Sequence, residues 1–139
     1  MEITGPDNPG DKLILIVDDD DSVIELFDFI ARKEGFKTVK AASGEAAIKT
    51  TRLLHPALVL LDLMLPKPGG FEVMRELQGD ETSDIPIVIV TGRYMDRSTQ
   101  EMIKQEPNVK GFLEKPVEPQ TLAALLHTLL KTCAPIRPV

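Results

Sequence analysis

The segment Leu58-Val59-Leu60-Leu61-Asp62 places four aliphatic residues in succession and follows them with a single carboxylate. Because no polar residue alternates with the aliphatic ones, the pattern predicts a strand covered on both faces, as in the middle of a parallel sheet. Residues 63–70 contain two prolines and two glycines, which continue neither a strand nor a helix. Open α/β sheets bind ligands beyond the carboxyl ends of their strands, so Asp62 is a candidate site residue.

The rest of the chain alternates strand patterns with helix patterns. The predicted strands are residues 13–17, 36–42, 58–62, 85–90 and 109–113. The predicted helices are residues 23–31, 43–54, 71–77, 96–105 and 118–131, and we expect the fourth to be polar and short or mobile. Lysines interrupt residues 36–42, which indicates a strand at the sheet edge. This alternation predicts an α/β fold with one parallel sheet and helices on both faces.

Polar residues follow the predicted strands at the point where each one ends. Asp18 and Asp19 come after the first strand, Asp62 ends the third, Thr91 follows the fourth, and Lys115 lies just beyond the fifth. The carboxyl ends of parallel strands lie along one edge of the sheet, so residues far apart in sequence converge there. We therefore expect acids, a hydroxyl and an ammonium group at one site.

Composition restricts the classes of function. A net charge of −6 makes direct binding of nucleic acid unfavourable, because phosphate binding needs a basic patch. No apolar run reaches the length of a membrane span, and residues 1–11 lack the apolar region of a secretory signal. The single cysteine, Cys133, cannot form an internal disulfide, which fits a cytoplasmic protein. The 139 residues suit one domain, predicted as residues 12–132, between a flexible leader (1–11) and a tail or linker (133–139).

The motifs at the strand ends resemble those of the receiver domains of two-component response regulators. The resemblance rests on four pieces in the right order, spread over residues 12–130: Ile14-Leu15-Ile16-Val17-Asp18-Asp19-Asp20, Leu60-Leu61-Asp62-Leu63-Met64-Leu65-Pro66 with Gly70, Ile87-Val88-Ile89-Val90-Thr91-Gly92, and Phe112-Leu113-Glu114-Lys115-Pro116. It implies a doubly wound sheet in the order 2-1-3-4-5, the order found in flavodoxin-like folds such as that of a chemotaxis receiver. In that order the first and third strands are neighbours, so Asp18, Asp19 and Asp62 would meet.

The resemblance also implies what the site residues do. Asp62 would accept a phosphoryl group, and a carboxylate can form such an acyl phosphate. Mg²⁺ would bind Asp19 and Asp62 directly, Asp18 directly or through water, and the backbone carbonyl of Met64. Crowded carboxylates need such a cation to stay ionised together.

On the other side of the site, Lys115 would pair with the phosphoryl oxygens and the Thr91 hydroxyl would donate to one of them. Phe112 stands at the position of a switching aromatic residue. Met64 and Arg93 occupy variable positions that tune the lifetime of the phosphoryl group, in a direction that the sequence does not give. Gly92 would keep the site open to a donor, and the Lys115-Pro116 bond is a candidate cis peptide.

Structural explanations compete with these roles. Asp62 and Thr91 could satisfy their own loops, Lys115 could be an ordinary solvated lysine, and Phe112 could be a core residue. Helix capping is better assigned to Asp20, Asp21 or Ser22 than to Asp18 or Asp19. We expect solvated or capping roles for His55 and His127. Residues 107–112 depart from the usual lead-in to the fifth strand, which leaves the fourth helix and its following loop uncertain and suggests an unusual partner there.

The predicted function is that of a receiver rather than of an enzyme. A histidine kinase or histidine phosphotransfer protein would phosphorylate Asp62, and the surface of the fourth helix, fifth strand and fifth helix would then change to signal to an output domain or downstream protein. One alternative is a Mg²⁺-dependent phosphatase, but its usual second acid is replaced by Met64. The other is a binding module that needs no phosphorylation. Neither nucleic acid nor membrane is an expected direct partner, and whether the receiver stands alone or precedes another domain stays open.

Overall fold

One parallel sheet forms the centre of the molecule in a computed structural model that describes residues 5–79, 81–92 and 95–135. Within these residues it has five strands in the order β2-β1-β3-β4-β5. Their bounds are β1 Leu13–Val17, β2 Lys37–Ala41, β3 Leu58–Asp62, β4 Ile87–Thr91 and β5 Val109–Glu114. All four neighbouring pairs are parallel. The doubly wound α/β fold and its strand order are therefore confirmed.

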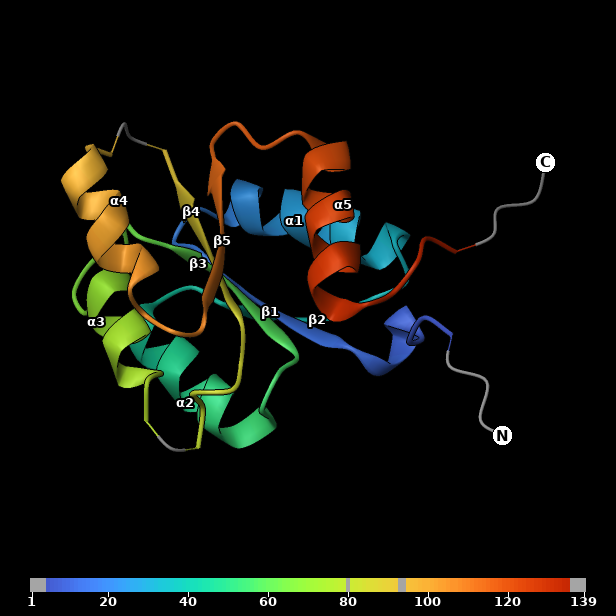
Figure 1. Cartoon of the computed structure of the whole chain (residues 1–139), viewed down its shortest axis with the longest axis horizontal. Helices are drawn as coiled ribbons and strands as arrows, with labels where there is room; N and C mark the ends of the chain where they lie inside the picture. The colour runs from blue at the N-terminus through green and yellow to red at the C-terminus, as the bar shows by residue number, and fades with distance from the viewer. Residues whose placement is uncertain (1–4, 80, 93–94, 136–139) are drawn as a thin grey trace.

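Helices cover both faces of this sheet (Figure 1). The α-helices of the described chain are α1 Asp21–Lys33, α2 Gly44–Leu54, α3 Gly70–Glu76, α4 Arg97–Lys104 and α5 Pro119–Leu130. α1 and α5 lie on one face, and α2, α3 and α4 lie on the other. The first face buries the α1/α5 core and the second buries the α2–α4 core, as we call these two apolar clusters below.

The three central strands contribute side chains to both cores because successive side chains point to opposite faces of the sheet. Leu58 and Leu60 of β3 belong to the α1/α5 core, while Val59 and Leu61 belong to the α2–α4 core. Every residue of β3 is buried. The continuous aliphatic run of this strand therefore has the cause that the sequence suggests: neither of its faces meets water.

The edges of the sheet and its strand starts differ slightly from the prediction. β2 lies at one edge with Lys37 and Lys40 exposed, as expected. β4 begins at Ile87, two residues later than predicted, because Pro86 has no N–H to donate to a ladder. The Pro86 carbonyl still accepts a hydrogen bond from the Val59 N–H at 3.0 Å.

The described part of the predicted leader, residues 5–11, has local structure. Pro9–Asp11 form a short 3-10 helix, which Asn8 caps by accepting a hydrogen bond from the Gly10 N–H at 2.8 Å. The Asp7 N–H donates to the Lys131 carbonyl at 2.8 Å, beyond the end of α5. Composition alone suggests a loose segment here, because the contact that orders it comes from more than a hundred residues along the chain.

The unusual residues before β5 have a structural role. Asn108 is buried, and its carbonyl accepts a hydrogen bond from the Ile87 N–H at 2.7 Å. Its side-chain amide bonds the Gln78 side chain and donates to the Leu77 carbonyl at 3.4 Å. Asn108 thus connects the end of α3 to the starts of β4 and β5. Both α4 and β5 form close to their predicted bounds, so the departure from the common motif does not disrupt them.

Candidate functional site

Four strands deliver polar residues to the carboxyl edge of the sheet. Asp18 directly follows β1, Asp62 is the last residue of β3, Thr91 is the last of β4, and Lys115 directly follows β5. Asp62 pairs in register with Val90, the residue before Thr91. The predicted convergence of these side chains is therefore what the fold produces.

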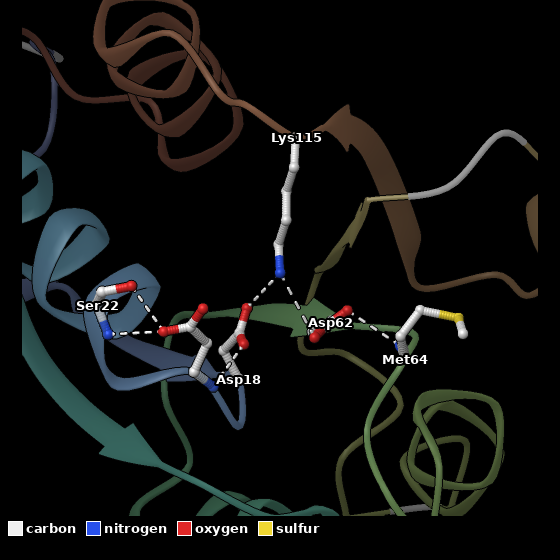
Figure 2. A network of polar contacts seen from close by, with 6 residues as sticks. Asp18, Ser22, Asp62, Met64 and Lys115 are labelled. Carbon is white, nitrogen blue, oxygen red and sulfur yellow. Dashed lines mark hydrogen bonds and ion pairs between the residues drawn. The ribbon is translucent and has the colours of Figure 1, made fainter.

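Lys115 links two of these strands by direct contacts. Its Nζ lies 2.8 Å from Asp18 Oδ2, as a hydrogen bond, and 3.5 Å from Asp62 Oδ2. Figure 2 shows the lysine side chain reaching down between the two carboxylates. The Lys115 N–H also donates to the Thr91 carbonyl at 2.8 Å, and the Lys115-Pro116 peptide bond is cis, as expected. Lys115 is thus a paired site residue and not a solvated surface lysine.

The orientation of Asp62 is fixed by the loop that follows it. The Met64 N–H donates to Asp62 Oδ1 at 3.0 Å, which leaves Oδ2 facing Lys115. Gly70, at the start of α3, lies against the end of β3: a Cβ there would come within 2.5 Å of the Asp62 carbonyl oxygen and of Leu63 Cα. A residue without a side chain is therefore required where α3 meets β3.

Capping of α1 separates the acids after β1 into two roles. Asp20 is the N-cap, and its Oδ1 accepts hydrogen bonds from the Ser22 N–H at 2.9 Å and the Ser22 hydroxyl at 2.6 Å. Asp18 is buried, and its Oδ1 accepts from the Asp20 N–H at 2.9 Å. The prediction that a residue after Asp19 provides the cap is confirmed, and Asp18 and Asp19 remain directed to the site.

The acids at this edge suit a hard divalent cation. Asp18, Asp19 and Asp62 each offer a carboxylate oxygen, and these oxygens all lie within 4.8 Å of one another. A set made only of carboxylate oxygens matches the preference of Mg²⁺, which takes one or two carboxylates and keeps water in its other positions. The acid cluster itself is a feature of this structure, and the residues present fit the ion that the sequence suggests.

Burial and charge change the acid–base properties of the two central groups. Burial raises the pKa of Asp62, and the charge of Asp18 raises it further, against the opposing effects of the Met64 N–H and Lys115. Burial alone would lower the pKa of Lys115, but its hydrogen bond to Asp18 and the charge of Asp62 raise that pKa above its ordinary value. Lys115 therefore stays an ammonium group. The charged form of Asp62 is disfavoured by its surroundings, and a bound cation would stabilise it.

The remaining predicted residues lie around this centre. Thr91 and Phe112 border a cavity of about 310 Å³ between α4 and the ends of β4 and β5. A Cβ on Gly92 would lie 3.6 Å from Lys115 Cδ, an ordinary contact, so the glycine leaves space beside the lysine. The Met64 side chain is half exposed, as a variable position at the mouth of the site would be. Arg93 lies outside the described residues.

The polar contacts of Lys104 and His127 escaped the sequence analysis. Lys104, near the end of α4, has its Nζ 5.5 Å from the centre of the Phe112 ring. His127 of α5 is largely buried, with Nε2 2.9 Å from Glu34 Oε1 and Nδ1 2.7 Å from Thr132 Oγ1. Of the two roles predicted for the histidines, solvated or capping, the solvated one is therefore wrong for His127, whereas His55 caps the end of α2. No local pattern signals the contact of Lys104 with Phe112 or that of His127 with Glu34, because these partners are brought together by the fold.

Comparison with known proteins agrees with this arrangement. Residues 14–127 match the family described as "Response regulator receiver domain". The chain belongs to the response regulator receiver family. The receiver is 37% identical over 118 residues to the "DNA-binding response regulator MtrA" of Mycolicibacterium smegmatis, covering 85% of this chain and 50% of that protein. It is 38% identical over 122 residues to the "Probable transcriptional regulator ycf27" of Cyanophora paradoxa, covering 86% and 48%.

Solved structures show the same receiver fold. A putative response regulator from Chloroflexus aurantiacus superposes with a TM-score of 0.76 at 31% identity, covering 86% of this chain and 97% of the other. The receiver spans about half the length of the curated relatives that it matches. A search of its described residues finds no helix with both the length and the apolar character that a bilayer crossing requires.

Proposed function

We propose that Asp62 accepts a phosphoryl group from a phosphohistidine of a histidine kinase or histidine phosphotransfer protein. The observation that carries this proposal is the position of Lys115 Nζ between the oxygens of Asp18 and Asp62, beside a carboxylate whose orientation is fixed. In the transfer, the N–P bond of the donor breaks as an O–P bond to Asp62 forms. The imidazole leaves with the electron pair of the broken bond.

Phosphoryl transfer depends mainly on positioning and on neutralising charge. The Met64 N–H orients the Asp62 carboxylate, and Lys115 would pair with the phosphoryl oxygens when they arrive. The Thr91 hydroxyl would donate to a phosphoryl oxygen from the end of the neighbouring strand. Asp18 holds Lys115 by the shorter of its two carboxylate contacts, so it keeps the ammonium group in place before the donor binds.

Mg²⁺ is the cofactor that we propose for this site. Asp18, Asp19, Asp62 and the backbone carbonyl of Met64 would hold it. When bound, it supplies positive charge that offsets the repulsion among the acids and stabilises the phosphoryl oxygens in the transition state. The raised pKa of Asp62 supports the need for such a charge, because burial and the charge of Asp18 together outweigh the opposing effects of the Met64 N–H and Lys115.

The product of the reaction is a changed surface rather than a released compound. The added charge would draw Thr91, and with it Phe112, inward, and so shift a two-state equilibrium of the surface formed by α4, β5 and α5. That surface would signal to an output domain or a downstream protein. We do not class the receiver as an enzyme, since it promotes only its own phosphorylation and the hydrolysis of its own acyl phosphate.

Two other functions have weaker support. A phosphatase using Asp62 as nucleophile would need a general acid, and at the position two residues later stands Met64, whose side chain has no proton to donate. A binding module that works without phosphorylation would have no use for three acids and an ammonium group gathered at one edge of the sheet.

Labelling with a small radioactive acyl phosphate tests the proposal. We expect Mg²⁺-dependent label on the wild type, none on Asp62→Ala, and a loss of more than about ten-fold on Asp19→Asn, by analogy with the effect of disturbing metal sites. Asp21→Asn is the matched control, because Asp21 is an exposed acid in the first turn of α1 outside the acid cluster. Undiminished label on Asp62→Ala, or label that is indifferent to chelation of Mg²⁺, would contradict the proposal. Steady turnover of a phosphomonoester would instead favour the phosphatase.

A further inference from the structure

α4 has little buried surface against the rest of the molecule. All eight of its residues are described, and Ile103 is the buried one among them. Met102 beside it is half exposed. Since a surface helix is stabilised mainly by its buried apolar face, a helix with one fully buried side chain can shift at low energetic cost. The few other contacts of α4 therefore have a large influence on its position.

One of those contacts reaches the proposed switching residue. Lys104 lies in the last turn of α4, and its Nζ is 5.5 Å from the centre of the Phe112 ring on β5. Phe112 is partly buried and packs against the α2–α4 core, whereas Lys104 is exposed. An ammonium group at this distance from a ring face is attracted by the ring quadrupole. The pair thus connects the end of α4 to the side chain that we expect to move.

A cavity lies next to this pair on the side of the phosphoryl site. It has a volume of about 310 Å³, and both Lys104 and Phe112 line it together with Thr91 and Met95. Thr91 is the last residue of β4, and Phe112 pairs in register with Ile89, two residues earlier in that strand. A ring that moved towards Thr91 along this cavity would change its position relative to the Lys104 ammonium group and so alter the contact between them.

We propose that Lys104 is a positioning residue that opposes switching: its ammonium group holds the Phe112 ring in the resting position and fixes the end of α4 to β5. The inference rests on the proposed function, because the equilibrium that it biases is the one driven by the phosphoryl group. Phenylalanine has no hydroxyl that could bond water in an outward position, so the attraction between the Lys104 ammonium group and the ring face is the polar contact that holds this ring in place. Removing the cation frees the ring and favours the phosphoryl-bound state.

The expected effect follows from the strength of such contacts. An exposed cation–π pair is worth about 0.5–1 kcal/mol, which corresponds to about a two- to five-fold change in an equilibrium constant. Lys104→Gln should therefore increase the apparent affinity for beryllofluoride, a phosphoryl analogue, by about two- to five-fold in the presence of Mg²⁺. Lys104→Arg keeps a cation above the ring and should resemble the wild type.

Methionine methyl groups labelled with carbon-13 can report on the two steps separately. Met64 donates its N–H to Asp62 and reports occupancy of the site, whereas Met95 lines the cavity and Met102 lies on α4. The titration compares the wild type, Lys104→Gln, Lys104→Arg and the charge control Lys110→Gln. Lys110 is an exposed lysine of β5 two residues before Phe112, so its loss changes the net charge equally.

The outcomes distinguish this inference from the function on which it rests. If the Met64 methyl group does not respond to beryllofluoride in any protein, the proposed function fails and the inference fails with it. If Met64 responds but Lys104→Gln binds as the wild type does, or Lys110→Gln gives an equal gain, the inference alone is overturned.

A double-mutant cycle excludes a simple effect on α4. Lys104 also lies near the negative end of the helix dipole, so its loss could act through the helix. In a Phe112→Leu background the ring is absent, and the gain from Lys104→Gln should disappear. A gain that persists there would assign the effect to α4 itself and overturn the proposed contact with the ring.

Discussion

Asp62 combines burial, a fixed orientation and proximity to another acid in one side chain. Burial raises its pKa, so the folded protein binds a proton at this carboxyl more readily than the unfolded chain does. Whenever the folded state binds more protons, the free energy of unfolding decreases as pH rises. The contribution of Asp62 to stability is thus most favourable below its unfolded pKa of about 3.8 and is lost as pH rises through the higher folded value. Functional acids with this property are destabilising at neutral pH.

Substitution of Asp62 by asparagine tests that sign. Without Mg²⁺ at neutral pH, Asp62→Asn should raise the melting temperature, because it removes a buried charge that is disfavoured by desolvation and by Asp18. The gain should shrink as pH falls through the folded pKa of Asp62 towards 3.8. Thermal unfolding at a series of pH values measures it. A melting temperature that falls at neutral pH would show that the contacts of Asp62 with Lys115 and Met64 outweigh its burial.

At the scale of elements, the sequence predicted most of what the structure contains. β1 and β3 match their predicted bounds because each is a run of aliphatic residues with clear limits. Lys12 precedes β1 and Pro56 lies shortly before β3, while an aspartate stands at the carboxyl end of each strand. Ser43 and Asp96 cap α2 and α4 as local patterns suggest. Site residues could be predicted because parallel strands bring their carboxyl ends to one edge.

What could not be predicted depends on contacts between distant parts of the chain. His127 is paired with Glu34, which is 93 residues away, and the Asp7 N–H bonds the Lys131 carbonyl at the end of α5. The contact between Lys104 and Phe112 depends on how α4 docks on β5, and no periodicity encodes that docking. The hydrophobic pattern of a short segment indicates which face of the element a side chain occupies, but it does not identify a partner far away in the sequence.

The junction of β3 and α3 gives a prediction at this scale. Gly70→Ala would place a Cβ 2.5 Å from two backbone atoms, which cannot move aside as a flexible side chain could. We expect a loss of about 1–3 kcal/mol in the free energy of unfolding, typical of overpacking, together with weaker phosphorylation as the Asp62 loop moves. Urea denaturation measures the first effect. Gly79→Ala is the control, since its Cβ would meet its nearest atom, the Glu76 carbonyl oxygen, at 3.7 Å. Equal stability of the two variants would contradict the tight junction.

At the scale of the whole molecule, His127 connects the helices of one face. It joins α5 to Glu34 at the end of α1 and to Thr132 beyond α5, and its ring lies 5.1 Å from that of Phe36. Both the histidine and the glutamate side chains are nearly nine-tenths buried. The contact lies in the α1/α5 layer, away from the acid cluster. We therefore expect it to affect the stability of the fold and not the chemistry.

The same substitution at the two histidines tests this role. His127→Asn cannot reach both Glu34 and Thr132 and leaves a buried carboxylate without this partner, so the free energy of unfolding should fall by about 1–3 kcal/mol. His55→Asn should change it by less than about 0.5 kcal/mol, because the pair of His55 with Asp84 is exposed and asparagine tolerates the left-handed backbone there. Urea denaturation of both variants provides the comparison. Equal losses would show that His127 has no special structural role.

The hydrogen bond between Lys115 and Asp18 joins residues 97 positions apart. A ribosome synthesising this protein produces all three acids of the cluster well before it adds the lysine that neutralises them. Until the fifth strand emerges and docks, any assembly of the earlier strands would bring the carboxylates together without the ammonium group that pairs with Asp18 and Asp62. If Asp62 accepts a phosphoryl group as we propose, competence would arise only when the final strand joins the sheet, and translation products that end before Lys115 would lack it.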